Sequence, residues 1–254
     1  MKRCKLAVGT TVALIMLMMA AVCLAGEKPV VLFDEGHGQR FVIGENGPLH
    51  LAGLAERFRT ARFEVQRSDG PLTGGMLESV DVLVLSGPFT PYTADEVTAI
   101  GRFLERGGRL AAMIHIAPPL ADLLHRIGVD FSNGVIREQD SVIGDEPLNF
   151  RVTRLAGDPP MAGLSGFSVY GCWALTNIDS RATIIASTGD QASVDLGKGP
   201  DGKPVRAVQS FGVAVAGNLG AGRYVAFGDD AIFQNRYLDV DNRHLADNLV
   251  QWLK

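Results

Sequence analysis

The segment Val30-Val31-Leu32-Phe33-Asp34-Glu35-Gly36-His37-Gly38-Gln39-Arg40 decides how the rest of the chain is interpreted. An apolar run of four residues ends abruptly in a loop that carries two carboxylates, an imidazole, an amide and a guanidinium. A continuous apolar run is typical of a strand that is covered on both faces. Ligands of open α/β sheets collect just beyond the carboxyl ends of such strands, so this loop is the first candidate for a functional site.

The first half of the chain alternates between strand and helix patterns. Strands are expected at 63–66, 81–86 and 109–116, and helices at 49–58, 94–106 and 120–127. The second helix follows Thr93-Ala94-Asp95-Glu96, which has the spacing of a capping box, and it ends before Gly107-Gly108. This alternation predicts an α/β fold with a doubly wound, mostly parallel sheet.

The middle third has a different pattern. Between residues 129 and 207 the apolar runs are short, β-prone and separated by Gly, Pro and Asp. We expect an antiparallel β elaboration within a single domain that spans 26–254. The regular pattern returns in a buried strand at 223–228 and an amphipathic helix at 242–253.

Residues 1–25 have the pattern of a secretory signal peptide. A basic start precedes an apolar run at 6–22, and Cys23-Leu24-Ala25 provides a small-residue cleavage site. The sequence therefore predicts an exported protein, periplasmic or secreted. An uncleaved membrane anchor and a lipid-modified Cys23 are the alternatives.

Charge and cysteine content exclude two classes of protein. The net charge is −4, and residues 26–254 carry 21 basic against 28 acidic side chains, because the first 25 residues hold three of the 24 bases and no acid. A mildly acidic domain is a poor binder of the phosphate backbone, so no nucleic-acid partner is expected. Cleavage after Ala25 would leave Cys172 as the single cysteine, which excludes an internal disulfide.

Several motifs in one order resemble a known family. They are Phe33–Gln39 at the start, Gly107-Gly108-Arg109-Leu110, and Gly222–Asp230 followed by 242–253 at the end. Together they resemble domains of the class I glutamine amidotransferase-like fold over residues 29–254. Such domains include the uncharacterised bacterial family called domain of unknown function 4350, gliding-type transport accessory proteins and the N-terminal domain of an intraflagellar transport subunit.

The resemblance implies a flavodoxin-like sheet, but one feature of the family's chemistry is missing. Amidotransferases place a nucleophilic cysteine just after the strand that corresponds to 109–116. Here the turn reads His115-Ile116-Ala117-Pro118-Pro119, without cysteine or serine, and Cys172 lies in the irregular middle. Nucleophilic catalysis needs an activated side chain with a base in reach, so glutamine hydrolysis is not expected.

The predicted site lies at the carboxyl edge of the sheet. In a sheet ordered 2-1-3-4-5, the loops after the first and third strands flank the switch point, and the last strand ends on the same edge. The predicted ligand-binding residues are Asp34, Glu35, His37, Gln39, Ser86, His115, Asp229, Asp230 and Asn235.

Three hypotheses follow for this edge. In the first, a non-enzymatic domain binds a small molecule, a carbohydrate, or a cell-envelope or transport protein, with Phe89, Tyr92 and Trp173 available to pack on the ligand. In the second, a hydrolase or lyase uses His37 or His115 with Asp34 as an acid–base pair. In the third, these residues only stabilise their own loops.

Metal assistance is a variant of the second hypothesis. Asp34, His37, His115 and Asp229 have side chains that bind divalent ions. However, the sequence has no HxH or HExxH spacing, and the candidates are divided among separate loops, with only Asp34 and His37 on the same one. We therefore expect neither a metal site nor a cofactor.

Overall fold

Five strands form the parallel half of one large sheet in the computed structural model, which describes residues 28–254. These strands are β1 (Val30–Asp34), β2 (Glu64–Ser68), β3 (Val82–Ser86), β4 (Arg109–Met113) and β15 (Gly222–Phe227). They lie in the order β2-β1-β3-β4-β15, and each neighbouring pair is parallel. The carboxyl ends of β1, β3, β4 and β15 therefore meet at one edge of the sheet.

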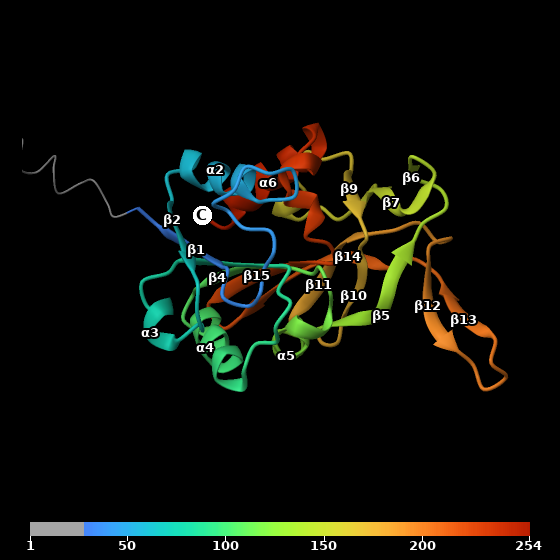
Figure 1. The fold of residues 1–254 in the computed structure, drawn as a ribbon, viewed down its shortest axis with the longest axis horizontal. Coiled ribbons are helices and arrows are strands. Elements are labelled where there is room, and N and C mark those ends of the chain that lie inside the picture. The colour runs from blue at the N-terminus through green and yellow to red at the C-terminus, as the bar shows by residue number, and fades with distance from the viewer. Residues whose placement is uncertain (1–27) are drawn as a thin grey trace, which may run out of the picture.

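Helices cover both faces of this parallel half (Figure 1). The first face is covered by α2 (Ala52–Thr60) and α6 (Val240–Trp252), whose Leu54, Phe58 and Leu249 join a buried core with Phe33 and Val84. The second face is covered by α3 (Gly74–Leu77), α4 (Ala94–Glu105) and α5 (Ala121–Arg126). Within residues 28–254, none of the helices is long and apolar enough to cross a bilayer.

The helix ends follow from side-chain capping. Thr93 and Glu96 form the predicted capping box at the start of α4, and the Asp239 side chain accepts a hydrogen bond from Asn242 N at the start of α6. The helix predicted from residue 49 begins only at Ala52. Residues 48–51 form a turn instead, in which the carbonyl groups of Pro48 and His50 accept hydrogen bonds from Arg236 and Asn235.

The antiparallel half is built mainly from the middle of the chain. Its strands are β5 (Val129–Arg137), β8 (Arg154–Leu155), β10 (Trp173–Asn177), β11 (Ala182–Ser187), β12 (Ser193–Lys198), β13 (Pro204–Val208) and β14 (Gly212–Leu219). A separate antiparallel sheet contains β6 (Val142–Ile143), β7 (Glu146–Val152) and β9 (Phe167–Tyr170). The β12–β13 hairpin projects from the body of the protein (Figure 1).

Short 3-10 helices complete the chain. They are η1 (Pro118–Leu120), η2 (Pro159–Met161), η3 (Ala231–Phe233) and η4 (Asn235–Tyr237). Two of them, η3 and η4, lie between β15 and α6. The segment after β15 therefore turns tightly at the carboxyl edge before the last helix begins.

The sequence-based prediction of a doubly wound, mostly parallel, flavodoxin-like sheet is wrong. Among the described residues the large sheet has 12 strands, and seven of its eleven pairings are antiparallel. The reason is local: short turns join β12 to β13 and β14 to β15, and strands joined by short turns pair antiparallel. The middle third thus extends the main sheet and makes it a mixed one. The predicted signal segment, 1–25, lies outside the described residues.

Candidate functional site

Two groups of side chains occupy the carboxyl edge of the parallel strands. The first, which we name the His37 cluster, consists of Asp34, His37, Gln39, Tyr92 and Glu96. The second, which we name the His115 surface, consists of Arg40, Phe41, Phe89, His115 and Trp173, with Asp230 beneath it. Each group contains a histidine that contacts an aspartate, and the two groups differ in what surrounds that pair.

The His37 cluster is a closed hydrogen-bond network. His37 Nδ1 lies 2.8 Å from Asp34 Oδ2, and His37 Nε2 lies 2.9 Å from Glu96 Oε1. Asp34 Oδ2 also accepts hydrogen bonds from Tyr92 Oη at 2.6 Å and Gln39 Nε2 at 2.7 Å. The Tyr92 ring stacks on the imidazole with the ring centroids 4.0 Å apart. Each polar group of the cluster therefore has a partner within the cluster itself.

The rest of the cluster is held by backbone groups. Asp34 Oδ1 accepts from Gly36 N and Ser68 Oγ, both at 3.1 Å. Glu96 accepts from Leu72 N, and it also completes the capping box of α4. At Gly36 a Cβ would lie 2.5 Å from the carbonyl oxygen of Gly70, so only glycine permits this close approach of the two loops.

Electrostatics favour a charged imidazole in this cluster. Burial lowers the pKa of His37, but hydrogen bonds and charge interactions with Asp34 and Glu96 outweigh it, so the pKa is raised. Burial likewise raises the pKa of Asp34, but hydrogen bonds from His37 and Tyr92 lower it below its ordinary value. The pKa of Glu96 is also lowered. Burial alone would raise it, but hydrogen bonds from Thr93 and Leu72 and the charge interaction with His37 outweigh burial. The two carboxylates that face the His37 imidazole thus favour its charged form.

This geometry leaves the cluster closed to a substrate. His37 is 5% exposed and Asp34 is 3% exposed, and both ring nitrogens of His37 face carboxylate oxygens. A general base needs a free lone pair within reach of a substrate proton. His37 and Asp34 lie within hydrogen-bonding distance of each other, but their hydrogen-bonding groups are already used to hold three loops together.

The His115 surface is open to solvent. His115 follows β4 by two residues, and its side chain is 37% exposed. Its Nδ1 lies 3.0 Å from Oδ1 of the buried Asp230, which follows β15. The ring of Phe41 lies 5.3 Å from the imidazole, centroid to centroid, and that of Phe89 lies 5.2 Å from it. Trp173 Nε1 donates a hydrogen bond to the carbonyl oxygen of His115 at 3.1 Å.

Two adjacent carboxylates lie beneath this surface. Burial, together with the charge of Asp230, raises the pKa of Asp229 to about 7. Burial also raises the pKa of Asp230 above its ordinary value, although the hydrogen bond to His115 opposes the shift. The hydrogen bond to Asp230 raises the pKa of His115 in turn. Asp229 accepts hydrogen bonds from Tyr170 N and Ala231 N, which fix it below the surface.

The remaining predicted residues have local roles. Glu35 accepts from Ile43 N at 2.7 Å and pairs with Arg67. Asn235 links two loops, because it accepts from Gly53 N and donates to Gly47 O. Ser86 ends β3 in a buried position, where its Oγ has no hydrogen-bond partner among the described residues. Cys172 is fully buried, and burial raises the pKa of its thiol well above the ordinary value.

The four residues considered as metal ligands do not come together at one place within residues 28–254. Asp34 and His37 belong to the His37 cluster, whereas His115 belongs to the His115 surface and Asp229 is buried below that surface. The described residues contain no group of three or more His, Cys, Asp or Glu side chains that is arranged to hold an ion. The four proposed ligands are thus divided between two places on the edge.

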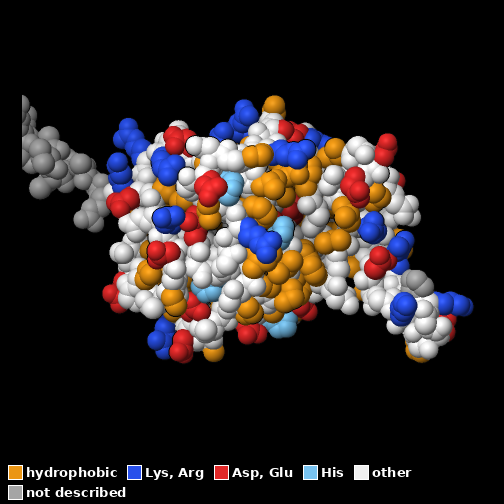
Figure 2. Space-filling view, viewed as in Figure 1, with side chains coloured by type: hydrophobic (Ala, Val, Ile, Leu, Met, Phe, Trp, Pro, Cys, Tyr) orange, Lys and Arg blue, Asp and Glu red, His pale blue; other side chains and the backbone are white. Residues whose placement is uncertain are grey.

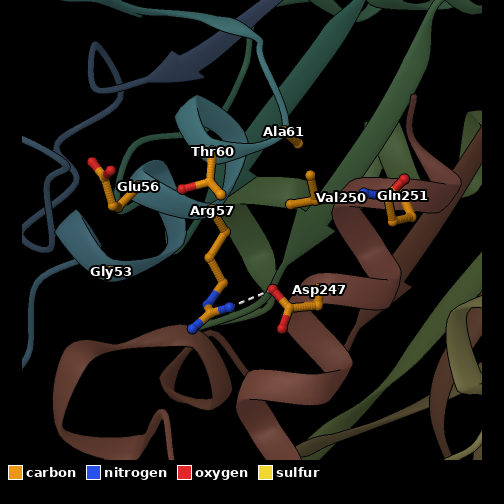
Figure 3. Close-up of a pocket in the computed structure, with 8 residues that line it drawn as sticks. All are labelled: Gly53, Glu56, Arg57, Thr60, Ala61, Asp247, Val250 and Gln251. Atoms are coloured by element: carbon orange, nitrogen blue, oxygen red, sulfur yellow. Dashed lines mark hydrogen bonds and ion pairs between the residues drawn. The ribbon is translucent and has the colours of Figure 1, made fainter.

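A separate hollow lies between α2 and α6 (Figure 3). It has a volume of about 390 Å³, and Arg57 of α2 reaches across it to Asp247 of α6. Glu56, Thr60 and Gln251 also line it. None of the predicted site residues lines this hollow, and its central cation and anion are paired with each other.

Three members of these groups have no sequence signal that assigns them to a site. The spacing of Glu96 from Thr93 predicts only a capping box, although one of the Glu96 oxygens reaches His37 across 59 positions of sequence. Arg40 and Phe41 stand in or next to the opening segment, but nothing in the pattern shows that they lie beside His115. Of the three aromatic residues expected near the site, Tyr92 lies in the His37 cluster, and Phe89 and Trp173 lie at the His115 surface.

Comparison with known proteins identifies the family. The family model described as a domain of unknown function, DUF4350, matches residues 44–250. The chain belongs to the DUF4350 family. The resemblance inferred from the opening and closing motifs is therefore confirmed at the level of the family.

Two similar proteins show the fold beyond that family. The intraflagellar transport protein 52 homolog of Mus musculus is 24% identical over 226 residues, which cover 79% of this chain and 50% of that protein. The chain therefore spans about half the length of this curated relative. The solved mmIFT52 N-terminal domain superposes with a TM-score of 0.71 at 19% identity, covering 88% of this chain and 96% of that domain.

A more distant similarity shows the same fold. A ThuA-like protein from Bacteroides uniformis has a TM-score of 0.54 at 13% identity, covering 90% of this chain and 93% of the other. At this identity the likeness concerns the fold alone. The site must therefore be interpreted from the residues of this chain.

Proposed function

We propose that this domain is a non-enzymatic assembly module that binds a partner protein through the His115 surface. The observation that carries the proposal is the exposed imidazole of His115 bordered by the rings of Phe41 and Phe89. Aromatic and arginine side chains are enriched at protein interfaces, where they supply most of the binding energy. Figure 2 shows hydrophobic side chains gathered across the middle of one face, with basic and histidine side chains among them.

Two further observations support an assembly role. The predicted acid–base pair, Asp34 and His37, is buried and occupied by its own contacts. In addition, a similar protein is an intraflagellar transport protein, and the region that matches this chain is about half of that protein. A domain carried within a transport protein is consistent with partners that are themselves proteins.

Site-specific photo-crosslinking tests the proposal. A photoreactive phenylalanine analogue is placed at Phe89 in the full chain and expressed in the native cell, and a matched control carries it at Ile178. Ile178 is 51% exposed and follows the far end of β10 from Trp173. We expect one defined protein to be crosslinked from position 89 and not from 178. Equal crosslinking from both positions, or none from 89, would contradict the proposal.

A second candidate function is supported by one specific observation. His115 has its Nδ1 on a buried carboxylate and its ring half exposed, which is the arrangement of a histidine oriented for proton transfer. In this variant of the hydrolase or lyase hypothesis, Asp230 replaces Asp34 as the orienting acid. Turnover on ester, amide or glycoside panels that disappears in His115→Gln would favour it. Absence of turnover on all panels would favour the assembly module.

We propose, in addition, that the protein is exported. The basis is the signal-like pattern of residues 1–25. Mass spectrometry of the chain purified from a bacterial periplasmic fraction should show a new N-terminus after Ala25. A chain found only in the cytoplasmic fraction with its first residues intact would contradict this.

A further inference from the structure

Arg40 and His115 form a small cationic site at the centre of the His115 surface. The Arg40 guanidinium carbon lies 4.6 Å from the centroid of the Phe89 ring, and the imidazole of His115 contacts the same ring. Arg40 is exposed, and the structure shows no ion pair for it among the described residues. Its charge acts on His115, because it opposes the raised pKa of that imidazole. The guanidinium of Arg40 and the imidazole of His115 are therefore presented together on the Phe89 ring, with Asp230 beneath His115.

The aromatic rings give this site an apolar border. Phe89 lies beneath Arg40 and beside His115, and Phe41 meets the imidazole edge to face at 70°. A guanidinium that stacks on a ring keeps its in-plane donors free for a ligand. An anion bound by Arg40 and His115 would thus have an apolar neighbour on the same ligand packed against the two phenylalanines.

The carboxylates below the surface restrict the charge of the ligand. Asp230 contacts His115 directly, so part of the positive charge that His115 can carry is already balanced. A carboxylate beneath the site repels a doubly charged phosphate more strongly than a singly charged carboxylate, so the site favours the lower charge. A planar carboxylate also matches the paired donors of a guanidinium.

We propose that Arg40 and His115 bind a carboxylate from an acidic segment of the partner protein, next to an apolar side chain that packs on Phe41 and Phe89. The inference rests on the proposed function and names the chemistry of the partner. Gly87 contributes to the floor of the site, since its φ of +56° is left-handed and a Cβ there would collide with Oδ2 of Asp230. The backbone thereby lets Asp230 remain directly beneath His115.

Peptide titration monitored at the His115 ring tests this inference. The probe is acetyl-Glu-Phe-Glu-amide, and the matched control is acetyl-Gln-Phe-Gln-amide, each added to the full chain with isotope-labelled histidine. We expect the acidic peptide to shift the His115 ring signals and to raise its apparent pKa, because a bound carboxylate favours the imidazolium. The neutral peptide should bind at least about tenfold more weakly.

Two variants distinguish the site from general charge attraction. Arg40→Gln should weaken binding of the acidic peptide at least about tenfold, whereas Arg102→Gln should leave it unchanged. Arg102 is a matched control, because it is exposed near the end of α4 and lies far from the carboxyl edge. Equal binding of both peptides, or equal effects of both variants, would overturn the inference.

The remaining outcomes are also decisive. Tighter binding of the corresponding phosphoserine peptide would replace the carboxylate site with a phosphate site and overturn the inference. If a protein is crosslinked at position 89 but the acidic peptide does not bind, the assembly module stands and the carboxylate site fails. If the peptide binds but no protein is crosslinked, the site stands as a small-ligand site and the assembly module fails.

Discussion

The two histidine–aspartate pairs at the carboxyl edge share their chemistry and differ in their surroundings. His37 uses both ring nitrogens inside the protein, on Asp34 and Glu96, and is 5% exposed. His115 uses one nitrogen on Asp230 and keeps 37% of its side chain exposed. The difference shows that a histidine–aspartate pair at the carboxyl edge of a sheet does not by itself form a functional site. Solvent access and an unused donor or acceptor decide whether the histidine is structural or available for binding.

The largest expected effect concerns the buried acid of the His37 cluster. Asp34→Asn removes one of the two carboxylates that contact the buried His37 imidazole and also weakens the hydrogen bonds from Tyr92 and Gln39. We expect the free energy of unfolding to fall by about 3–5 kcal/mol, as for other buried pairs that lose one partner. Urea unfolding gives the value, and Asp190→Asn, in an exposed pair with Arg154, should show little change. Similar results for the two variants would mean that the His37 cluster is not stabilising.

The second effect is a pH dependence of stability. The pKa of His37 is raised in the folded state, so its contribution is complete below its ordinary value of 6.5 and is lost as the pH rises through the folded value. The pKa values of Asp34 and Glu96 are lowered, so their contributions are present above 3.8 and 4.5 and are lost as the pH falls through the folded values. The His37 cluster should therefore stabilise the protein most between these limits.

Unfolding measured from pH 6 to pH 9 checks the direction in which the His37 contribution to stability changes with pH. The wild-type free energy of unfolding should decrease over this range, and it should decrease less in His37→Gln. Asp229 contributes to the same fall, because its folded pKa is about 7 against an ordinary 3.8, but it is unchanged in the variant. The difference between the two curves thus isolates His37, and parallel curves would refute the assignment.

The smallest expected effect concerns the exposed histidine. His115→Gln keeps a donor for Asp230, and solvent screens the charge that is lost. We expect the free energy of unfolding to fall by about 1 kcal/mol or less. Thermal or urea unfolding of His115→Gln and His37→Gln, measured side by side, shows which substitution lowers the free energy of unfolding more. A larger loss in His115→Gln than in His37→Gln would reverse the roles assigned to the two histidines.

The sequence predicted the parallel half of the sheet better than the antiparallel half. Buried parallel strands such as Val82–Ser86 are continuous apolar runs, and the helix after Thr93 has a capping signal of its own. In the middle third, strands were expected, but nothing in the sequence shows which strands will pair. The turn that joins β14 to β15 is short, but the pairing of β14 with β10 and of β5 with β12 depends on contacts between segments that are far apart in the sequence.

Prediction of the candidate site was limited for a similar reason. Strand ends indicated Asp34, His37 and His115, because polar residues follow apolar runs there. Which partner each one takes is decided by loops that meet only in the folded protein. Glu96 reaches His37 from α4, and Asp230 reaches His115 from β15, so sequence spacing alone could not separate the buried pair from the exposed one.

The position of β15 has a consequence for how the chain is made. Arg223 pairs with Arg109, and Asn218 pairs with Arg223, so β15 is the strand that joins the two halves of the large sheet. During synthesis, the edge of β4 that pairs with β15 stays unpaired until residues 222–227 have emerged from the ribosome. Long-range parallel pairing is slow, and an unpaired edge strand invites association with other chains. Nascent chains that are arrested before residue 222 should therefore depend on chaperones far more than those arrested after β15 has been released.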